Sequence, residues 1–385
     1  MIRLEKQNFS VKIIPFCTAS VLSLIILILT LVSPAKQYED SPESVSMPAL
    51  TVEAMANRSF SQKFESYLTR KFPGYPLGKK SANSLKRFTG EKELDGIFAL
   101  KEKLIENVTM ANPVTGQKNL EAVLNYSSAE HGFGINCLFG LIPTASEIYK
   151  EELPSSPDIL DQTQLIAQCY ERFPRKEVVD ISTSLMSRKT DQIFYRTDSH
   201  WSSLGSYLGY QTVIKALGGL PYSEDMFNIE YVSHNFYGSL SDKTFLQYMS
   251  PDTIDLYHYV NGQKVASVNK IFGRSQIVSA DFYDREKNNS YGIFLGDECG
   301  ITQLFTTVGN GKKLLVFGDS YSYSMMQFLS LHYEEIVLVN LKYLTWEQSQ
   351  LIDTKSYPDQ LILYSVDEFI NDNNISTKLS YFTQK

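Results

Sequence analysis

The sequence predicts an α/β protein with a mainly parallel sheet covered on both faces, preceded by one membrane-spanning helix. Two observations carry this prediction. Strand-like and helix-like runs alternate near the C-terminus, and an uncharged apolar run stands near the N-terminus. The chain has 385 residues, of which 43% are hydrophobic. That is enough for one large domain or two small ones.

The apolar run at residues 13–33 is about as long as a bilayer core is thick. Three basic residues precede it and an acidic stretch follows, so we expect 1–12 to be cytoplasmic and the main domain extracytoplasmic. A cleaved signal peptide is the alternative. The run is longer than a usual signal core and has no clear cleavage site, which favours an uncleaved, single-pass signal-anchor in the cell membrane. A Pro- and Ser-containing linker is expected over 34–55, and the domain over 56–385.

Charge and cysteine content exclude some classes of function. The net charge of −7 argues against nucleic acid as a partner. Three cysteines lie beyond the apolar run, namely Cys137, Cys169 and Cys299. They leave two readings open, one disulfide with a spare thiol or three inert thiols. Their spacing matches no metal-binding pattern, so we expect no metal and no cofactor.

The first two thirds of the domain are predicted from apolar periodicity. The expected elements are a helix from Ser59 to near Pro73, a helix over 79–89, a short strand at 97–98, a helix from about 118, a buried strand over 134–142 with a helix after it, a helix over 157–173, a strand over 176–181 and a helix over 202–217. Gly205 and Gly209 share one face of the last helix, where small residues permit close packing. Only short β-like runs are expected over 225–310.

The C-terminal part has the clearest pattern. We expect strands over 313–317, 336–341 and 360–366, alternating with helices over 320–331 and 345–353. This β-α-β-α-β alternation implies parallel strands. Ligands of such sheets sit at the carboxyl ends of the strands, where Ser320 falls.

The turn Gly318-Asp319-Ser320 presents a serine between a strand and a helix. We expect Gly318 to permit a sharp turn, and the unpaired N–H groups of the helix's first turn to stabilise an oxyanion. Alternatively, Asp319 or Ser320 is only a helix N-cap. The second glycine of a Gly-x-Ser-x-Gly elbow is missing, which argues against an ordinary α/β-hydrolase lipase.

A second string supplies the other groups that a nucleophilic serine needs. Asp198 and His200 stand two residues apart and are followed by Trp201. In such a set His200 takes the proton from Ser320, and Asp198 holds the imidazole tautomer. The alternative is a surface pair. Trp201 either stacks on a sugar ring or packs beneath the loop.

The string 195–201, Tyr-Arg-Thr-Asp-Ser-His-Trp, resembles the defining motif of the DHHW proteins, relatives of the alginate O-acetylation (AlgX/AlgJ-type) proteins in the SGNH hydrolase-like group. Residues 143–149, 236–243 and 313–336 resemble further segments of the family, and the likeness covers roughly 55–370. It implies an SGNH-like α/β/α sandwich with Asp198, His200 and Ser320 as the triad. It also implies that Ser320 accepts acetyl from a membrane-bound O-acyltransferase and passes it to a polysaccharide hydroxyl.

The sequence departs from the family pattern at three places. Ser199 stands where the family name calls for His, Asn340-Leu341-Lys342-Tyr343 replaces Asp-Leu-Arg-Tyr, and Gly296-Asp297 replaces Gly-Asn. Lys342 can replace the charge of an arginine but not its planar fork. The further candidates for oxyanion or substrate contacts are Gly318, Asp319, Tyr321, Trp201, Lys342 and Arg196.

These observations predict an O-acetyltransferase that moves an acetyl group through a serine ester to a cell-surface or exported polysaccharide. Two alternatives stay open. A glycan acetylesterase would use the same triad with water as acceptor, and a glycan-binding or scaffold subunit of a polymer export complex would not use it at all.

Overall fold

The computed structural model describes residues 59–154, 159–262 and 264–383, with scattered positions between 18 and 50. Most of the segments 1–12, 13–33 and 34–55 lie outside the described residues, so the anchor and the linker stay predictions. Among the described residues, no helix has the length and apolar character needed to cross a membrane.

The chain divides into two compact units. One comprises the chain up to Leu94 together with Asp242–Leu246, and the other comprises Asp95–Ser241 and Gln247–Lys385. The division of the chain expected from its sequence stays a prediction.

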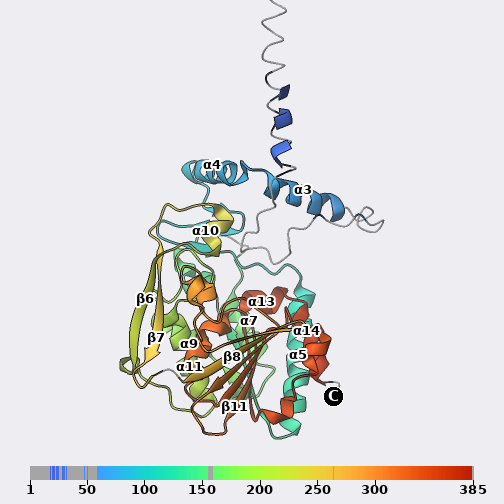
Figure 1. Cartoon of the computed structure of the whole chain (residues 1–385), viewed down its shortest axis with the longest axis vertical. Coiled ribbons are helices and arrows are strands. Elements are labelled where there is room, and N and C mark those ends of the chain that lie inside the picture. The colour runs from blue at the N-terminus through green and yellow to red at the C-terminus, as the bar shows by residue number, and fades with distance from the viewer. Residues whose placement is uncertain are drawn as a thin grey trace, which may run out of the picture. The chain divides into compact units, whose positions relative to one another are not determined.

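The smaller unit contains helices α3 (Ser59–Lys71) and α4 (Tyr75–Phe88) (Figure 1). Helix α4 begins earlier than expected because a proline occupies its first turn, where the missing N–H costs nothing. The segment Asp242–Leu246 contacts this helix: Asn83 Nδ2 donates a hydrogen bond to the Thr244 carbonyl at 2.9 Å, and the Tyr75 ring packs edge-on against Phe245.

An eight-stranded sheet forms the centre of the larger unit, with the order β5-β4-β13-β11-β12-β10-β8-β9. Its strands are β4 (Asn136–Ile142), β5 (Val178–Val179), β8 (Val265–Phe272), β9 (Ser275–Ser279), β10 (Ile301–Thr306), β11 (Lys313–Gly318), β12 (Glu335–Val339) and β13 (Asp359–Ser365). The five from β5 to β12 are parallel, while β10, β8 and β9 pair antiparallel. The predicted parallel sheet is therefore confirmed, and the antiparallel extension is an addition to it.

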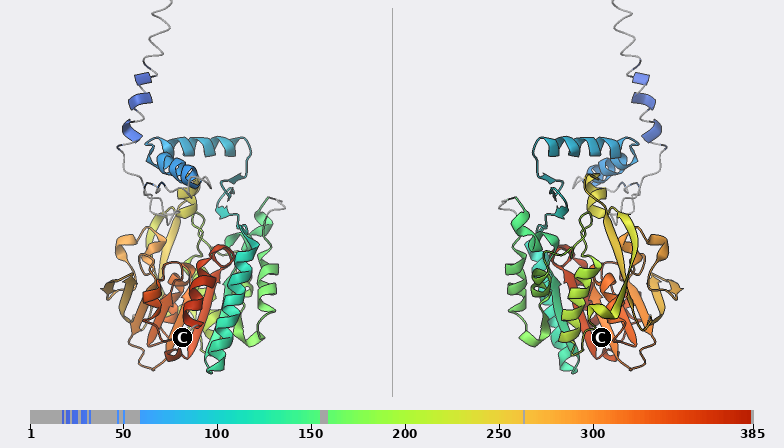
Figure 2. Two further views of the ribbon diagram at one scale, coloured as in Figure 1. Left: turned by 90° about the vertical axis from the view of Figure 1, so that its right-hand side faces the viewer. Right: turned by 90° about the vertical axis from the view of Figure 1, so that its left-hand side faces the viewer.

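Helices cover both faces of this sheet, because the buried strands carry apolar residues on both sides. On β11, Leu314 and Val316 face one core, and Leu315 and Phe317 face the other. The first core also takes in α6 (Ala145–Ile148), α8 (Ile181–Ser187), α9 (Ser203–Ala216) and α11 (Tyr321–Leu329). The second takes in α5 (Pro113–Gly132), α7 (Gln162–Tyr170), α13 (Val366–Asn371) and α14 (Asn374–Thr383). In Figure 2, α5 runs lengthwise beside the strands.

A separate antiparallel hairpin, β6 (Phe227–Phe236) with β7 (Asp252–Tyr259), packs on the first core. Figure 1 shows it on the opposite side of the sheet from α5 and α14. A shorter pair, β2 (Ile97–Ala99) with β3 (Leu104–Glu106), is also antiparallel.

Several sequence-based boundaries were wrong. Helix α5 begins at Pro113 rather than near 118, because the Asn112 side chain caps it by accepting from the Val114 N–H at 3.0 Å. Helix α12 (Trp346–Ser349) is shorter than expected, and α8, α13 and α14 were missed. The three cysteines beyond the apolar run are buried, free thiols.

Candidate active site

Ser320 lies between β11 and α11, at the carboxyl end of a parallel strand. Gly318 precedes it without a positive φ angle, so the expected sharp turn is not the reason for a glycine. The reason is crowding: a Cβ there would lie 2.2 Å from Ser322 Oγ and 2.8 Å from the Leu363 carbonyl oxygen on β13. The missing side chain at Gly318 therefore lets the first turn of α11 and the neighbouring strand β13 lie close to the end of β11.

Asp319 is buried and holds the turn in place. Its carboxylate accepts hydrogen bonds from the Tyr321 N–H at 3.1 Å and from the Ser365 N–H, at the end of β13, at 2.7 Å. Burial raises the pKa of Asp319 to about 7. The Tyr321 N–H is thus engaged, and the Ser322 N–H bonds to the Asp319 carbonyl at 3.0 Å. These two N–H groups are therefore not available to an oxyanion, and the expected role of the turn in oxyanion binding stays a prediction.

The structure brings Ser320, His200 and Asp198 together in one chain of hydrogen bonds. His200 Nε2 lies 2.7 Å from Ser320 Oγ, and His200 Nδ1 lies 2.6 Å from Asp198 Oδ1. Ser320 makes no side-chain capping bond to α11, so the N-cap alternative does not account for it. This arrangement lets the imidazole accept the serine proton while the carboxylate fixes the tautomer.

Asp198 is almost wholly buried and remains ionised. Besides His200 Nδ1, it accepts from the His200 backbone N–H at 2.9 Å and from the Ser239 N–H at 2.8 Å. Burial raises its pKa, but the attraction of His200 and these hydrogen bonds outweigh burial and hold the pKa at about 2. For His200, burial lowers the pKa, and the attraction of Asp198 outweighs this and raises it above the ordinary value. His200 is therefore a stronger base than a solvated imidazole.

Gly238 makes room for the Asp198 carboxylate. A Cβ at position 238 would lie 2.3 Å from both the Cβ and the Oδ2 of Asp198. The Gly238 N–H donates to Thr197 Oγ1 at 3.1 Å, which ties the two segments together. A side chain at this position would displace Asp198.

A second buried carboxylate, Asp252 at the start of β7, holds the segment before Asp198. It accepts from the N–H groups of Arg196 at 2.9 Å and Thr197 at 2.8 Å, and from Thr197 Oγ1 at 2.6 Å. The Arg196 guanidinium lies beside the same carboxylate, with Nε at 3.4 Å, and donates to the Pro251 carbonyl at 3.0 Å. Arg196, expected as a substrate or oxyanion contact, thus supports the loop.

Two aromatic rings define the surroundings of His200. The Tyr291 ring stacks on the imidazole with centroids 3.8 Å apart and planes 9° from parallel, and its hydroxyl donates to Ser324 Oγ at 2.8 Å. The Tyr321 ring lies 5.0 Å away, and its hydroxyl donates to the Ser199 carbonyl. One face of the imidazole is therefore covered, which restricts its rotation.

Trp201 is fully buried, so its stacking on a sugar ring is excluded. Its Nε1 donates to the Tyr321 carbonyl at 3.1 Å and to Ser324 Oγ at 3.0 Å. Gly209 of α9 admits the ring, because a Cβ there would lie 2.9 Å from two ring atoms of Trp201. A Cβ at Gly205 would lie 2.2 Å from the Ile193 carbonyl oxygen and 2.9 Å from the Trp201 Cβ. The prediction of close packing at these glycines is confirmed, and Trp201 forms the base of the loop.

Two of the three departures from the family pattern, those at 340–343 and 296–297, involve polar side chains outside the triad. Lys342 Nζ pairs with Glu368 Oε1 at 2.9 Å, and Asn340 Nδ2 donates to Glu298 Oε2 at 2.8 Å. Burial raises the pKa of Glu298, which interacts electrostatically with His200 and Lys342. The Asp297 side chain is largely exposed and pairs with Lys287. Its carboxylate cannot donate a hydrogen bond to an oxyanion.

A sequence profile of the family described as DHHW protein matches residues 83–339, more than half of the chain. The chain belongs to the DHHW family. A search of curated proteins gave no match.

Solved structures with TM-scores above 0.5 share the fold of this DHHW protein. A DHHW family protein from Eubacterium siraeum is 19% identical with a TM-score of 0.58, and the match covers 74% of this chain and 96% of that one. Bacillus cereus PatB1 is 16% identical with a TM-score of 0.62, covering 72% and 98%. A PatB1 structure with a sulfonyl adduct also matches. The O-acetyltransferase domain of Pseudomonas putida AlgJ matches at 15% identity and a TM-score of 0.48, covering 75% and 99%.

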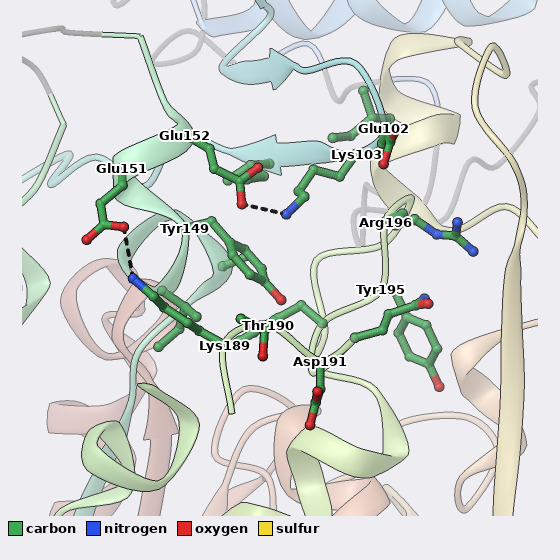
Figure 3. Close-up of a pocket in the computed structure, with 16 residues that line it drawn as sticks. Glu102, Lys103, Tyr149, Glu151, Glu152, Lys189, Thr190, Asp191, Tyr195 and Arg196 are labelled. Carbon is green, nitrogen blue, oxygen red and sulfur yellow. Dashed lines mark hydrogen bonds and ion pairs between the residues drawn. The ribbon is translucent and has the colours of Figure 1, made fainter. Parts of the chain in front are cut away.

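A polar cavity of about 460 Å³ adjoins the Asp198 loop of this DHHW protein (Figure 3). Its walls include α6, which follows β4, and residues 189–196. Two ion pairs line it, Lys103 with Glu152 at 2.9 Å and Lys189 with Glu151 at 2.8 Å, and the Tyr149 ring lies between them. In the sheet only β13 separates β4 from β11, so the ends of these two strands are about 10 Å apart.

Sequence reasoning missed Gly238, Ser239, Asp252, Tyr291 and Glu298. All five lie in the Tyr-, Asp- and Gly-rich region 225–310, where no periodic pattern separates one such residue from another. Gly238 and Ser239 lie in a segment that resembles the family, and this resemblance was the one sequence signal that could have identified them. Within the described residues, no group of three or more His, Cys, Asp or Glu side chains is arranged to hold a metal ion.

Proposed function

We propose that this protein is a serine-dependent O-acetyltransferase that acts on a hydroxyl of a cell-surface or exported polysaccharide. The observation that carries the proposal is the hydrogen-bonded chain from Ser320 Oγ through His200 to the ionised Asp198. The SGNH-like sandwich and the triad that the resemblance to the DHHW family implies are consistent with it.

The reaction proceeds in two transfers. Ser320 Oγ attacks the acetyl carbonyl carbon as its proton passes to His200 Nε2, and the leaving group departs with that proton. An acetyl ester of Ser320 remains. A sugar hydroxyl then gives its proton to His200 and attacks the ester, and Ser320 Oγ leaves and takes the proton back. Each half of the cycle restores the neutral imidazole.

The cavity that adjoins the Asp198 loop, with its charged side chains, supports a hydroxyl-rich acceptor. Ligands of parallel α/β sheets bind beyond the carboxyl ends of the strands, and this cavity lies beyond β4. Carboxylates, ammonium groups and a tyrosine ring supply donors and acceptors for several sugar hydroxyls. We therefore place the acceptor glycan across this cavity with one hydroxyl directed toward Ser320.

The expected signal-anchor and the family resemblance complete the proposal. The catalytic unit is extracytoplasmic and held to the cell membrane by residues 13–33, and a membrane-bound O-acyltransferase supplies acetyl to Ser320. A scaffold role would leave the complete triad without a use. An acetylesterase differs only in that water replaces the sugar, so kinetics must separate the two enzymes.

The proposal is tested with 4-nitrophenyl acetate and the detergent-solubilised full chain, followed by intact-mass and peptide mass spectrometry. We expect an acetyl group on Ser320 that hydrolyses slowly and is discharged faster by polysaccharide acceptors. The Ser320→Ala variant is the control. Rapid multiple turnover in water without any acceleration would identify an esterase. The absence of both adduct and turnover, with the fold intact by circular dichroism, would contradict the enzymatic proposal.

A further inference from the structure

Helix α4 turns apolar side chains toward the solvent. Leu77 is 71% exposed, Leu85 62% and Phe88 89%. At 3.6 residues per turn, the three lie within an arc of about 80° on the helix surface. Single exposed apolar residues are common on soluble proteins, whereas three on one arc of one helix are typical of an interaction surface. The exposed Ser81 lies on the same arc. We refer to Leu77, Leu85 and Phe88 as the α4 face.

The opposite side of α4 attaches the helix to its own unit. Asn83 is the one buried residue of this fully described helix, and it donates to the Thr244 carbonyl at 2.9 Å. Asn83 points about 160° away from the centre of the α4 face. The helix is thus anchored on one side through a polar contact and presents its apolar side outward.

The charge of α4 is opposite to that of the chain as a whole. The helix contains four basic residues and no acidic one, whereas the chain carries a net charge of −7. The basic residues are Lys79, Lys80, Lys86 and Arg87. Lys80 lies about 60° from Leu77, so its methylene groups can follow the apolar arc while the ammonium group stays at a polar boundary.

We propose that α4 binds the headgroup region of an anionic lipid bilayer, with the α4 face inserted and the helix axis in the plane of the membrane. Interfacial helices combine exposed apolar residues on one arc, basic residues on the remaining polar surface and low overall hydrophobicity. Lys80 and Arg87 border the α4 face on one side, and Lys79 and Lys86 lie on the opposite surface of α4. Each basic residue near an anionic surface adds attraction. A second copy of α4 would instead meet four like charges. The proposal does not depend on the catalytic function, and the expected anchor at 13–33 would keep α4 near the same bilayer.

The test uses the full chain with Phe88→Trp in a Trp346→Phe background, where the remaining native tryptophan, Trp201, is fully buried. The protein is reconstituted in phosphatidylglycerol or phosphatidylcholine vesicles with brominated acyl chains, which quench tryptophan on contact. Ala82→Trp in the same background is the matched control, because position 82 lies on α4 about 100° from the centre of the α4 face.

We expect the Phe88→Trp emission to shift to shorter wavelength and lose intensity in brominated phosphatidylglycerol, more than in phosphatidylcholine and more than for Ala82→Trp. Adding Lys80→Glu and Lys86→Glu should abolish the difference between the two lipids. Equal quenching at positions 82 and 88, equal quenching in both lipids, or no quenching would overturn the proposal. The spectrum of the Trp346→Phe parent, whose emission comes from the buried Trp201, is subtracted throughout. A short-wavelength difference spectrum for Phe88→Trp without vesicles would also overturn the proposal, because protein would then cover the face.

Discussion

The nucleophile and its base are held in two different ways. Ser320 sits in a strand-to-helix turn whose supports are close neighbours in the parallel sheet: Asp319 bonds to the Tyr321 and Ser365 N–H groups. The loop of Asp198 and His200 instead depends on segments that lie outside this sheet. Ser239 donates to Asp198 at 2.8 Å across 41 positions, and Asp252 holds Thr197 at 2.6 Å across 55.

This difference shows which part of the site is sensitive to remote changes. A parallel strand with its turn is positioned by backbone pairing on both sides, so the place of Ser320 follows from the sheet itself. The loop of His200 lies outside the regular sheet and is fixed by side chains and one glycine. Substitutions in 225–310 should therefore affect the base more than the nucleophile. Two variants of the triad itself set the scale, and two variants within 225–310 test this expectation.

The largest effect is expected from Ser320→Ala, which removes the attacking oxygen. In enzymes with this triad, loss of the nucleophile costs on the order of 10⁶-fold in rate. Stability should change little, because only the bond to His200 is lost, a contribution of about 1 kcal/mol. Ester hydrolysis and thermal unfolding measure both quantities. Activity within tenfold of the parent would show that Ser320 is not the nucleophile.

Asp198→Asn should lower the plateau rate by about 10⁴-fold and move the pH profile. Activity requires neutral His200, so it rises with pH through the pKa of His200, which Asp198 raises. Without the carboxylate, burial lowers that pKa, and the rising limb should shift to lower pH. Rates from pH 4 to 9 test both effects. An unshifted limb would show that Asp198 does not act on His200.

Gly238→Ala tests the remote support of the base. The added Cβ would lie 2.3 Å from Asp198 atoms, so the carboxylate must move. A displacement of about 1 Å costs about 10²-fold in rate. The matched control is Gly132→Ala, where a Cβ would meet nothing within 4 Å. Equal activity of the two variants would contradict the role assigned to Gly238.

Tyr291→Leu should have the smallest effect of the four. It removes the ring stacked 3.8 Å from His200, and aromatic contacts of this kind are worth about 0.5–1.5 kcal/mol beyond burial, which limits the loss to roughly tenfold. Tyr291→Phe keeps the ring and should retain most of the activity. If the Phe variant loses as much as the Leu variant, the hydroxyl bond to Ser324 is the important contact.

The sequence alone predicted the parallel strands and the residues that these strands and one short string bring together. The strands β4, β11, β12 and β13 were predicted because buried parallel strands are continuous apolar runs, and the meeting of Asp198, His200 and Ser320 was expected from two short strings. The antiparallel extension and the contacts of Asp252 and Tyr291 were not predicted. Those contacts join residues that are far apart in sequence. The residue types involved occur throughout the chain, so nothing in the sequence distinguishes these positions. The sequence did not decide whether the Trp201 ring stacks on a sugar or packs beneath the loop. Its burial depends on glycines in α9, an element separate from the string that contains Trp201.

The most direct test of the account is whether Ser320 becomes a reactive nucleophile only when His200 is present. The full chain is treated with phenylmethanesulfonyl fluoride, and the modified peptide is identified by mass spectrometry, in parallel with a His200→Gln variant. The account predicts one sulfonyl adduct on Ser320 in the parent chain and none in the variant over the same time. An adduct that forms equally fast in both chains, or at another residue, would contradict it.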